Sequence, residues 1–168
     1  MLIVALCLAA FLRNALWQDD MTIWADSLEK SPLKARGYNE LGIHYVSTRE
    51  YDKAYAVLQR SLELNKYQPE IYINLGLVYE GLKRIDLAVQ AYRNAVSYAP
   101  QDPIPYYNLG VIYYTNYKDL DAALVLFQKA RDLNPLEPDV HQYLGNIYRD
   151  KGDLQKANEE YQLNRSLK

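Results

Sequence analysis

The chain has 168 residues, a formal net charge of −2, one cysteine and 17 tyrosines. The near-neutral charge argues against a dedicated nucleic-acid binder, which needs a concentrated positive surface, and a single cysteine excludes an intramolecular disulfide. The length suits one ordinary domain, and the excess of tyrosine indicates that an aromatic position is repeated along the chain.

The first element is the apolar run Leu2–Leu12 (LIVALCLAAFL), which has no polar face. It is shorter than the roughly 20 residues that span a bilayer, and it lacks the basic start of a signal peptide. Three interpretations stay open. Residues 1–16 are the end of a transmembrane helix cut from a longer protein, the buried first helix of a degenerate repeat, or an atypical membrane anchor.

The second element is an expected helix at Trp17–Lys30. Trp24 lies one repeat length of 34 residues before Leu58, so this segment has the phase of the second helix of an earlier repeat. We expect Trp24 and Leu28 to pack on the first full repeat, and Pro32 to end the helix.

From residue 35 onward one pattern recurs every 34 or 35 residues. Two series of small residues share this period: Gly42, Gly76, Gly110 and Gly145, and Ala54, Ala88, Ala123 and Ala157. Both series absorb one extra residue in the third unit, which we place in a turn at Thr115–Asp121. Apolar spacing is helical, with prolines at the starts of the later units, so each unit is predicted to be two antiparallel helices that cross closely at the small residues.

The order of these residues resembles the tetratricopeptide repeat (TPR) family, which has an aromatic, Leu-Gly, Tyr, Ala, an aromatic, Ala and Pro. The second unit supplies all of them: Tyr72, Leu75, Gly76, Tyr79, Ala88, Tyr92, Ala95 and Pro100. The fourth unit departs from the pattern with His141 and Asn164. The resemblance implies an all-α, right-handed superhelical solenoid of antiparallel helix hairpins. Its repeats would be residues 35–68, 69–102, 103–137 and 138–168, after the apolar helix 1–16 and a lead-in helix in 17–34. Most tyrosines are then expected to bury their rings, with the hydroxyl at a polar edge.

The segment Leu2–Gly42 is also similar to one junction in multi-pass membrane proteins related to protein O-mannosyltransferases. In that family an apolar helix ends in Arg-Asn, here Arg13-Asn14, and a Trp-containing helix leads into TPRs. This resemblance implies an extracytoplasmic, membrane-associated repeat region, with a cytoplasmic location as the alternative. The catalytic residues of that family lie in a membrane part outside this sequence, so none is carried over.

The sequence offers no set of residues for catalysis, so we predict no enzyme activity, no cofactor and no metal site. His44 and His141 are interpreted as packing or surface residues, and Cys7 has no histidine neighbour. Asp19-Asp20 and Glu159-Glu160 are interpreted as solvated helix face, because adjacent side chains on a helix point apart.

In the TPR family the first helices line a concave groove that holds extended segments of partner proteins. The resemblance therefore implies a peptide-binding groove here. Its predicted residues are Asn39, Ile43, Ile73, Asn74, Leu77, Tyr107, Asn108, Val111, Tyr114, Gln142 and Asn146. Glu40, Val46, Ser47, Glu80, Thr115, Tyr143 and Arg149 are further inward positions.

Asn74 and Asn108 occupy equivalent positions one repeat apart, where an amide can both donate to and accept from a peptide backbone. Either the two residues form a two-rung asparagine ladder, or asparagine is simply common at this position in the family. Asn39, Ile104 and Asn108 stand where a carboxylate-clamp TPR would need Lys or Arg. We therefore predict that acidic C-terminal tails are not bound.

The leading functional hypothesis is a non-catalytic protein-interaction scaffold that binds an extended peptide and forms part of a membrane protein. The alternatives are an accessory, substrate-presenting domain of a membrane glycosyltransferase, and a soluble or self-associating adaptor. Self-association would use the exposed solenoid ends, where Tyr161 and Leu167 lack a following helix.

Overall fold

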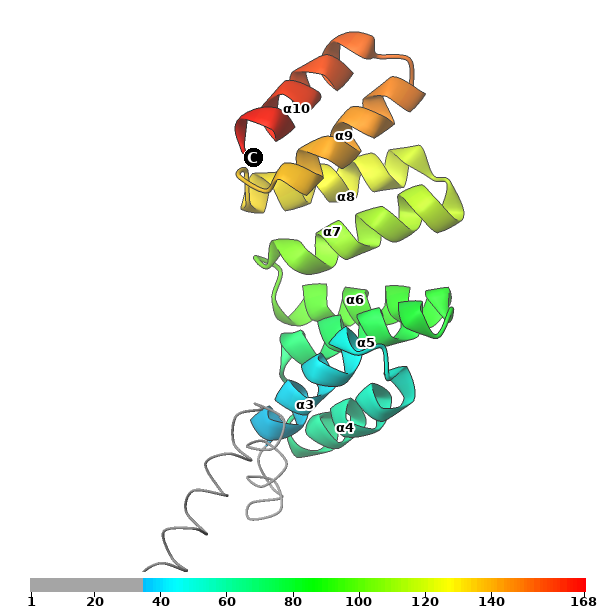
Figure 1. The fold of residues 1–168 in the computed structure, drawn as a ribbon, viewed down its shortest axis with the longest axis vertical. Helices are drawn as coiled ribbons and strands as arrows, with labels where there is room; N and C mark the ends of the chain where they lie inside the picture. Colours follow the sequence, from blue (N-terminus) through cyan, green and yellow to red (C-terminus); the bar gives the residue numbers. More distant parts are fainter. Residues whose placement is uncertain (1–34) are drawn as a thin grey trace, which may run out of the picture. The chain divides into compact units, whose positions relative to one another are not determined.

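The computed structural model describes residues 35–168, and the chain divides into two compact units, Met1–Tyr67 and Gln68–Lys168 (Figure 1). Across residues 35–168 all regular structure is helical, so the predicted all-α stack of hairpins is confirmed. The first unit contains α3 (Ala35–Ser47) and α4 (Tyr51–Leu64). The second contains α5 (Pro69–Gly81), α6 (Ile85–Tyr98), α7 (Pro103–Ile112), the π-helical turn η1 (Tyr113–Tyr117), α8 (Leu120–Leu133), α9 (Pro138–Asp150) and α10 (Leu154–Ser166). The segments Leu2–Leu12 and Trp17–Lys30 lie outside the described residues.

Helix ends follow local chemistry that is readable in the sequence. Pro69, Pro103 and Pro138 each occupy the first turn of a helix, where a missing N–H costs nothing. Each hairpin turns through one residue in the left-handed region, namely Arg49, Lys83, Lys118 and Gly152. The N–H of the next residue then donates to the carbonyl of a repeat tyrosine, as from Arg84 to Tyr79 at 2.8 Å.

The third repeat has one extra residue, and this residue widens the end of the first helix of that repeat. The predicted place of the extra residue, the turn Thr115–Asp121, is thereby refined. Here the closing hydrogen bond runs from the N–H of Asp119 to the carbonyl of Tyr113, at 3.0 Å. It therefore spans six residues, where the equivalent bond in the other repeats spans five. The added residue is absorbed as the π-helical turn η1, so the phase of α8 is preserved.

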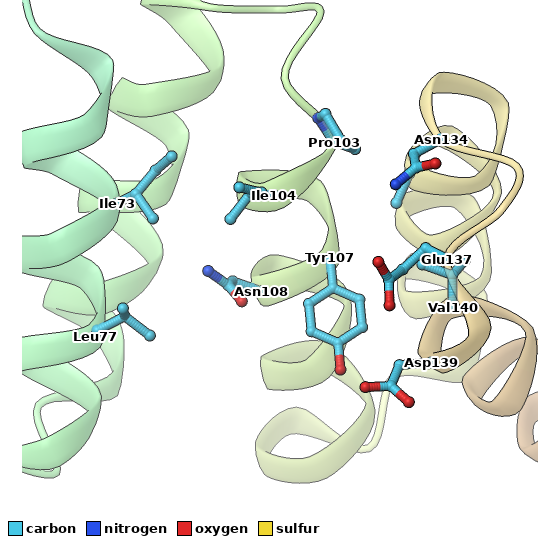
Figure 2. Close-up of a pocket in the computed structure, with 11 residues that line it drawn as sticks. Ile73, Leu77, Pro103, Ile104, Tyr107, Asn108, Asn134, Glu137, Asp139 and Val140 are labelled. Carbon is cyan, nitrogen blue, oxygen red and sulfur yellow. The ribbon is translucent and has the colours of Figure 1, made fainter. Parts of the chain in front are cut away.

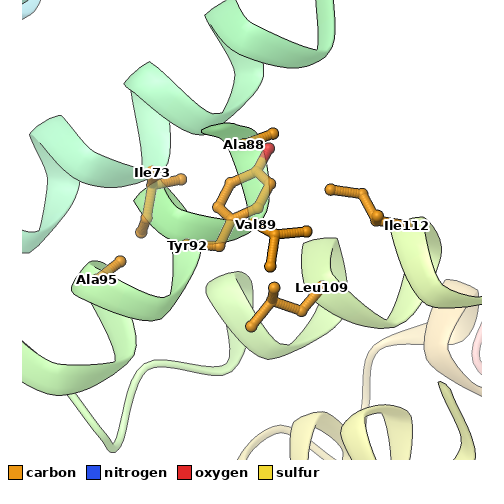
Figure 3. Packing of buried hydrophobic residues seen from close by; sticks show 7 residues of the cluster. All are labelled: Ile73, Ala88, Val89, Tyr92, Ala95, Leu109 and Ile112. Carbon is orange, nitrogen blue, oxygen red and sulfur yellow. The ribbon is translucent and has the colours of Figure 1, made fainter. Parts of the chain in front are cut away.

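Glycine in the Leu-Gly pair makes room for the large side chain of the second helix. A Cβ at Gly76 would lie 2.3 Å from a ring carbon of Tyr92, and one at Gly145 would lie 2.5 Å from a ring carbon of Tyr161. Tyr92 is fully buried between α5 and α6 and forms a cluster with Ile73, Ala88, Val89, Ala95, Leu109 and Ile112 (Figure 3). The glycine is thus required because a large side chain of the second helix faces it. This is a steric reason in addition to the expected close crossing of the two helices.

Only Tyr92 among the tyrosines is fully buried, and most of the others are half-buried, as are Tyr72 and Tyr79 beside the cluster around Tyr92. A stack of helix pairs has a thin core, so large rings lie along its margin. Their hydroxyls bond to neighbouring elements, as from Tyr114 to Asp150 at 2.7 Å and from Tyr117 to Asp86 at 2.6 Å.

Glu160 is buried in the last hairpin, so its assignment to a solvated helix face is wrong. Only 7 % of the residue is exposed, and its carboxylate lies 2.6 Å from Nδ1 of His141 and 3.4 Å from Arg131. The other ring nitrogen of His141 donates to the carbonyl of Pro135 at 2.9 Å, since a carbonyl can only accept. His141 replaces the repeat aromatic, and its two ring nitrogens are satisfied by the buried acid on one side and the Pro135 carbonyl on the other.

Glu80, predicted to face the groove, instead accepts a hydrogen bond from the buried hydroxyl of Tyr92 at 2.5 Å. Burial raises the pKa of the Glu80 carboxyl, against the opposing effects of the Tyr92 hydrogen bond and the charge of Lys83. A carboxyl whose pKa is raised on folding stabilises the protein below its unfolded pKa. That contribution is lost as the pH rises through its folded pKa.

Glu80→Gln keeps an acceptor for Tyr92 without the buried charge. We therefore expect this variant to be more stable than the parent at about pH 7 and equally stable at about pH 4, where Glu80 is protonated. Thermal unfolding at the two pH values measures the difference. An advantage of the same size at both values would contradict it.

Candidate functional site

The candidate site is a cavity of about 330 Å³ within the second unit (Figure 2). Helices α5, α7 and α9 and the end of α8 supply its walls. The lining residues are Ile73, Leu77, Pro103, Ile104, Tyr107, Asn108, Ala130, Asn134, Glu137, Asp139 and Val140. Its volume falls near the lower end of the range of about 300 to 1,000 Å³ that is usual for ligand-binding hollows.

Most of the cavity wall is apolar and open to solvent. Ile104 is 51 % exposed and Leu77 is 36 % exposed, whereas Ile73 at 8 % is anchored in the buried cluster of the second repeat. Side chains that are partly open and held by a rigid scaffold offer apolar area to a partner at little entropic cost. The hollow can therefore receive an apolar side chain.

Asn108 places an amide among these apolar side chains. In Figure 2 it extends from α7 toward the side of Ile73 and Leu77. Its side chain makes no hydrogen bond to any residue in the range 35–168. A half-buried amide with unused donors and acceptors suits a polypeptide backbone, whose N–H and C=O groups need partners.

The opposite side of the cavity is acidic. Glu137 is the N-cap residue of α9 but makes no side-chain capping bond, and Asp139 lies in the first turn of that helix. Burial, with Tyr143 and the charges of Asp139 and Glu137 nearby, raises the pKa of the Tyr107 hydroxyl to about 12. No lysine or arginine lines the cavity.

The structure distributes the predicted groove residues unevenly. Four of them, Ile73, Leu77, Tyr107 and Asn108, line the cavity. Val111 and Tyr114 pack beside the buried cluster of the third and fourth repeats, and Asn74 is half-buried with contacts inside the chain. In the first unit, Asn39 is buried and Ile43 is exposed on α3.

Gln142 and Asn146 lie in a second hollow, together with Arg149, Tyr161, Asn164, Arg165 and Lys168. Their amides are used internally, since Asn164 donates to Gln142 at 2.8 Å and Tyr161 donates to Asn146 at 2.9 Å. Tyr161 also packs over Gly145 and is half-buried, and its expected use in self-association stays a prediction. Leu154 and Leu163 are the large apolar side chains that α10 exposes.

The acidic side of the cavity was not among the predicted groove residues, which lie on the later turns of each first helix. Asp139 occupies the position equivalent to Ile104 one repeat earlier, directly after the proline that begins each helix. That position was already considered for the carboxylate clamp, so the same comparison applied to the fourth repeat would have found Asp139. Glu137 lies just before this helix and had no such signal.

The described part of the chain lacks the features of two other classes of site. Residues 35–168 contain no cluster of three or more His, Cys, Asp or Glu side chains placed to hold a metal ion. None of their helices is both long enough and apolar enough to cross a bilayer.

Three family models match the chain over residues 38–69, 82–116 and 118–163, and they are described as TPR repeat or tetratricopeptide repeat. The chain is built of tetratricopeptide repeats. No curated protein matches it. None of these matches shows the membrane-protein junction expected at Leu2–Gly42, which stays a prediction.

Solved structures agree with the TPR assignment. MamA 41-end from Desulfovibrio magneticus RS-1 is 26 % identical with a TM-score of 0.75, and covers 93 % of this chain and 88 % of that one. MamA AMB-1 is 28 % identical with a TM-score of 0.64, over 80 % and 73 % of the two chains. The pilF structure from Pseudomonas aeruginosa is 20 % identical with a TM-score of 0.81, over 98 % and 74 %, and supports the fold alone.

Proposed function

We propose that this TPR chain is a non-catalytic protein-interaction scaffold that holds an extended peptide across α5, α7 and α9. The observation that carries the proposal is the open, apolar cavity with the unused amide of Asn108 at its centre. Apolar walls hold a side chain and the amide holds the peptide backbone, which together are the requirements for binding an extended segment. The scaffold role is consistent with the matches of this chain to the tetratricopeptide repeat family.

A random dodecapeptide display library, selected on the immobilised 168-residue chain, tests this function. We expect enriched peptides, and we expect Asn74→Ala combined with Asn108→Ala to weaken them by at least about 1 kcal/mol, or roughly fivefold, by calorimetry. The single Asn108→Ala variant should carry most of the loss, because Asn108 lines the cavity. The melting temperature should change little.

Asn94→Ala is the matched control, since Asn94 is an exposed asparagine on α6 outside the cavity. It should leave affinity unchanged. If no peptide is enriched, or if the cavity variants bind enriched peptides as tightly as the parent, the groove is not the binding site.

Membrane attachment through Leu2–Leu12, and an accessory role beside a glycosyltransferase, rest on residues 2–42 of the sequence alone. The groove proposal is independent of both, because every residue that carries it lies in the second unit.

A further inference from the structure

The cavity has two chemically different sides, and they face different parts of a bound segment. Ile73, Leu77 and Ile104 make the side between α5 and α7 apolar (Figure 2). Glu137 and Asp139 make the side at the start of α9 acidic, and the ring of Tyr107 extends from α7 toward it. A segment that crosses α7 would meet first apolar surface and then negative charge.

The two carboxylates are not neutralised within residues 35–168. Neither forms an ion pair there, and Arg131, near the end of α8, is engaged by Asp132 at 3.1 Å and by Glu160 at 3.4 Å. The dipole of α9 contributes only about half a positive charge at its N-terminus, so two carboxylates leave the rim negative. Apolar walls around a fixed charge concentrate its field in the hollow, which favours a cation there.

We propose that the cavity selects peptides in which an apolar side chain lies within two positions of a lysine or arginine. The apolar side chain enters between α5 and α7, and the cation reaches Glu137 and Asp139. Extended residues two positions apart project to the same side, and the long stems of lysine and arginine also allow an adjacent position. This inference rests on the proposed function and adds the partner class to it.

The same carboxylates have a purely structural use, because acidic residues stabilise the start of any helix. A matched pair of variants separates the two roles. Glu137→Gln with Asp139→Asn removes both charges from the cavity. Glu70→Gln with Asp52→Asn removes one acid from the first turn of α5 and one from that of α4, outside the cavity. Both double variants change the net charge equally.

The dodecapeptide library is selected in parallel on the parent and on the two double variants. We expect the parent and the Glu70/Asp52 variant to enrich Lys or Arg within two positions of an apolar residue. We expect the Glu137/Asp139 variant to lose that preference, and to bind a parent-selected peptide at least about tenfold more weakly. Replacing the basic residue of that peptide by Gln should cost the parent a similar factor and cost the Glu137/Asp139 variant little.

Enriched peptides without a basic preference, but still dependent on Asn108, would overturn this inference and leave the proposed function standing. An unchanged basic preference in the Glu137/Asp139 variant would do the same. A library from which nothing is enriched, or peptides indifferent to Asn108, would overturn both.

Discussion

Glu160→Ala is expected to destabilise the last hairpin by about 3 kcal/mol, because it leaves Nδ1 of the buried His141 ring without its hydrogen-bond partner. The residue His141 is 3 % exposed, so water cannot readily replace the lost partner. Repeat arrays are stabilised by each unit and its nearest neighbours, so the damage should be local. Amide hydrogen exchange in α9 and α10 should accelerate by about 100-fold, while exchange in α5 and α6 changes little.

Glu159→Ala provides the control on the neighbouring residue, since Glu159 is exposed on the same helix. Its effect should be below about 0.5 kcal/mol. His141→Phe combined with Glu160→Met restores an apolar pair, and should recover most of the loss because nothing charged is left buried alone. Equal exchange in the Glu160→Ala and Glu159→Ala variants would show that the buried contact is not stabilising.

Gly76→Ala is expected to destabilise the second repeat by about 2 kcal/mol, although alanine is the better helix former by roughly 1 kcal/mol. The added Cβ would stand 2.3 Å from the ring of Tyr92. That ring is fully buried, and its hydroxyl is held by Glu80 at 2.5 Å, so it cannot move aside without opening the helix pair. Chemical denaturation monitored by circular dichroism measures the change.

Gly110→Ala is the matched comparison, because its Cβ would meet the ring of Phe127 at 3.0 Å, and Phe127 has no hydroxyl to tether it. A shift of a few tenths of an ångström suffices there, so the net change should be within about 1 kcal/mol. In a Tyr92→Ala background, Gly76→Ala should stabilise by up to about 1 kcal/mol, since the clash is removed and the higher helix propensity of alanine remains. Equal costs for Gly76→Ala with and without Tyr92 would contradict this explanation.

A departure from the repeat pattern accounts for one prediction that failed, and that failure has a packing cause. His141 was recognised as a substitute for an aromatic residue, but its need for a buried hydrogen-bond partner was not. Glu160 was therefore assigned to solvent, although it lies one helix away with its carboxylate against the ring. The sequence shows which positions are adjacent on one helix. It does not show which side chains of the two helices in a hairpin contact each other.

The cavity was predicted in part for a similar reason. Asn108 and Leu77 follow from their positions in the repeat, because a helical period assigns each residue to one face. Glu137 and Asp139 belong to the start of the following helix. Whether Glu137 and Asp139 line the cavity depends on how one hairpin stacks on the next. The helical periodicity within a single repeat does not describe that stacking.

The sequence by itself determined the hairpins of the described region, because small residues, prolines and apolar spacing act over a few turns of helix. It also determined where α5, α7 and α9 begin, since Pro69, Pro103 and Pro138 restrict only their own neighbourhood. The tertiary structure decided which side chains are buried in pairs, as with His141 and Glu160. It also decided that an acidic helix start lies against an apolar groove, because both features arise only when separate helices come into contact.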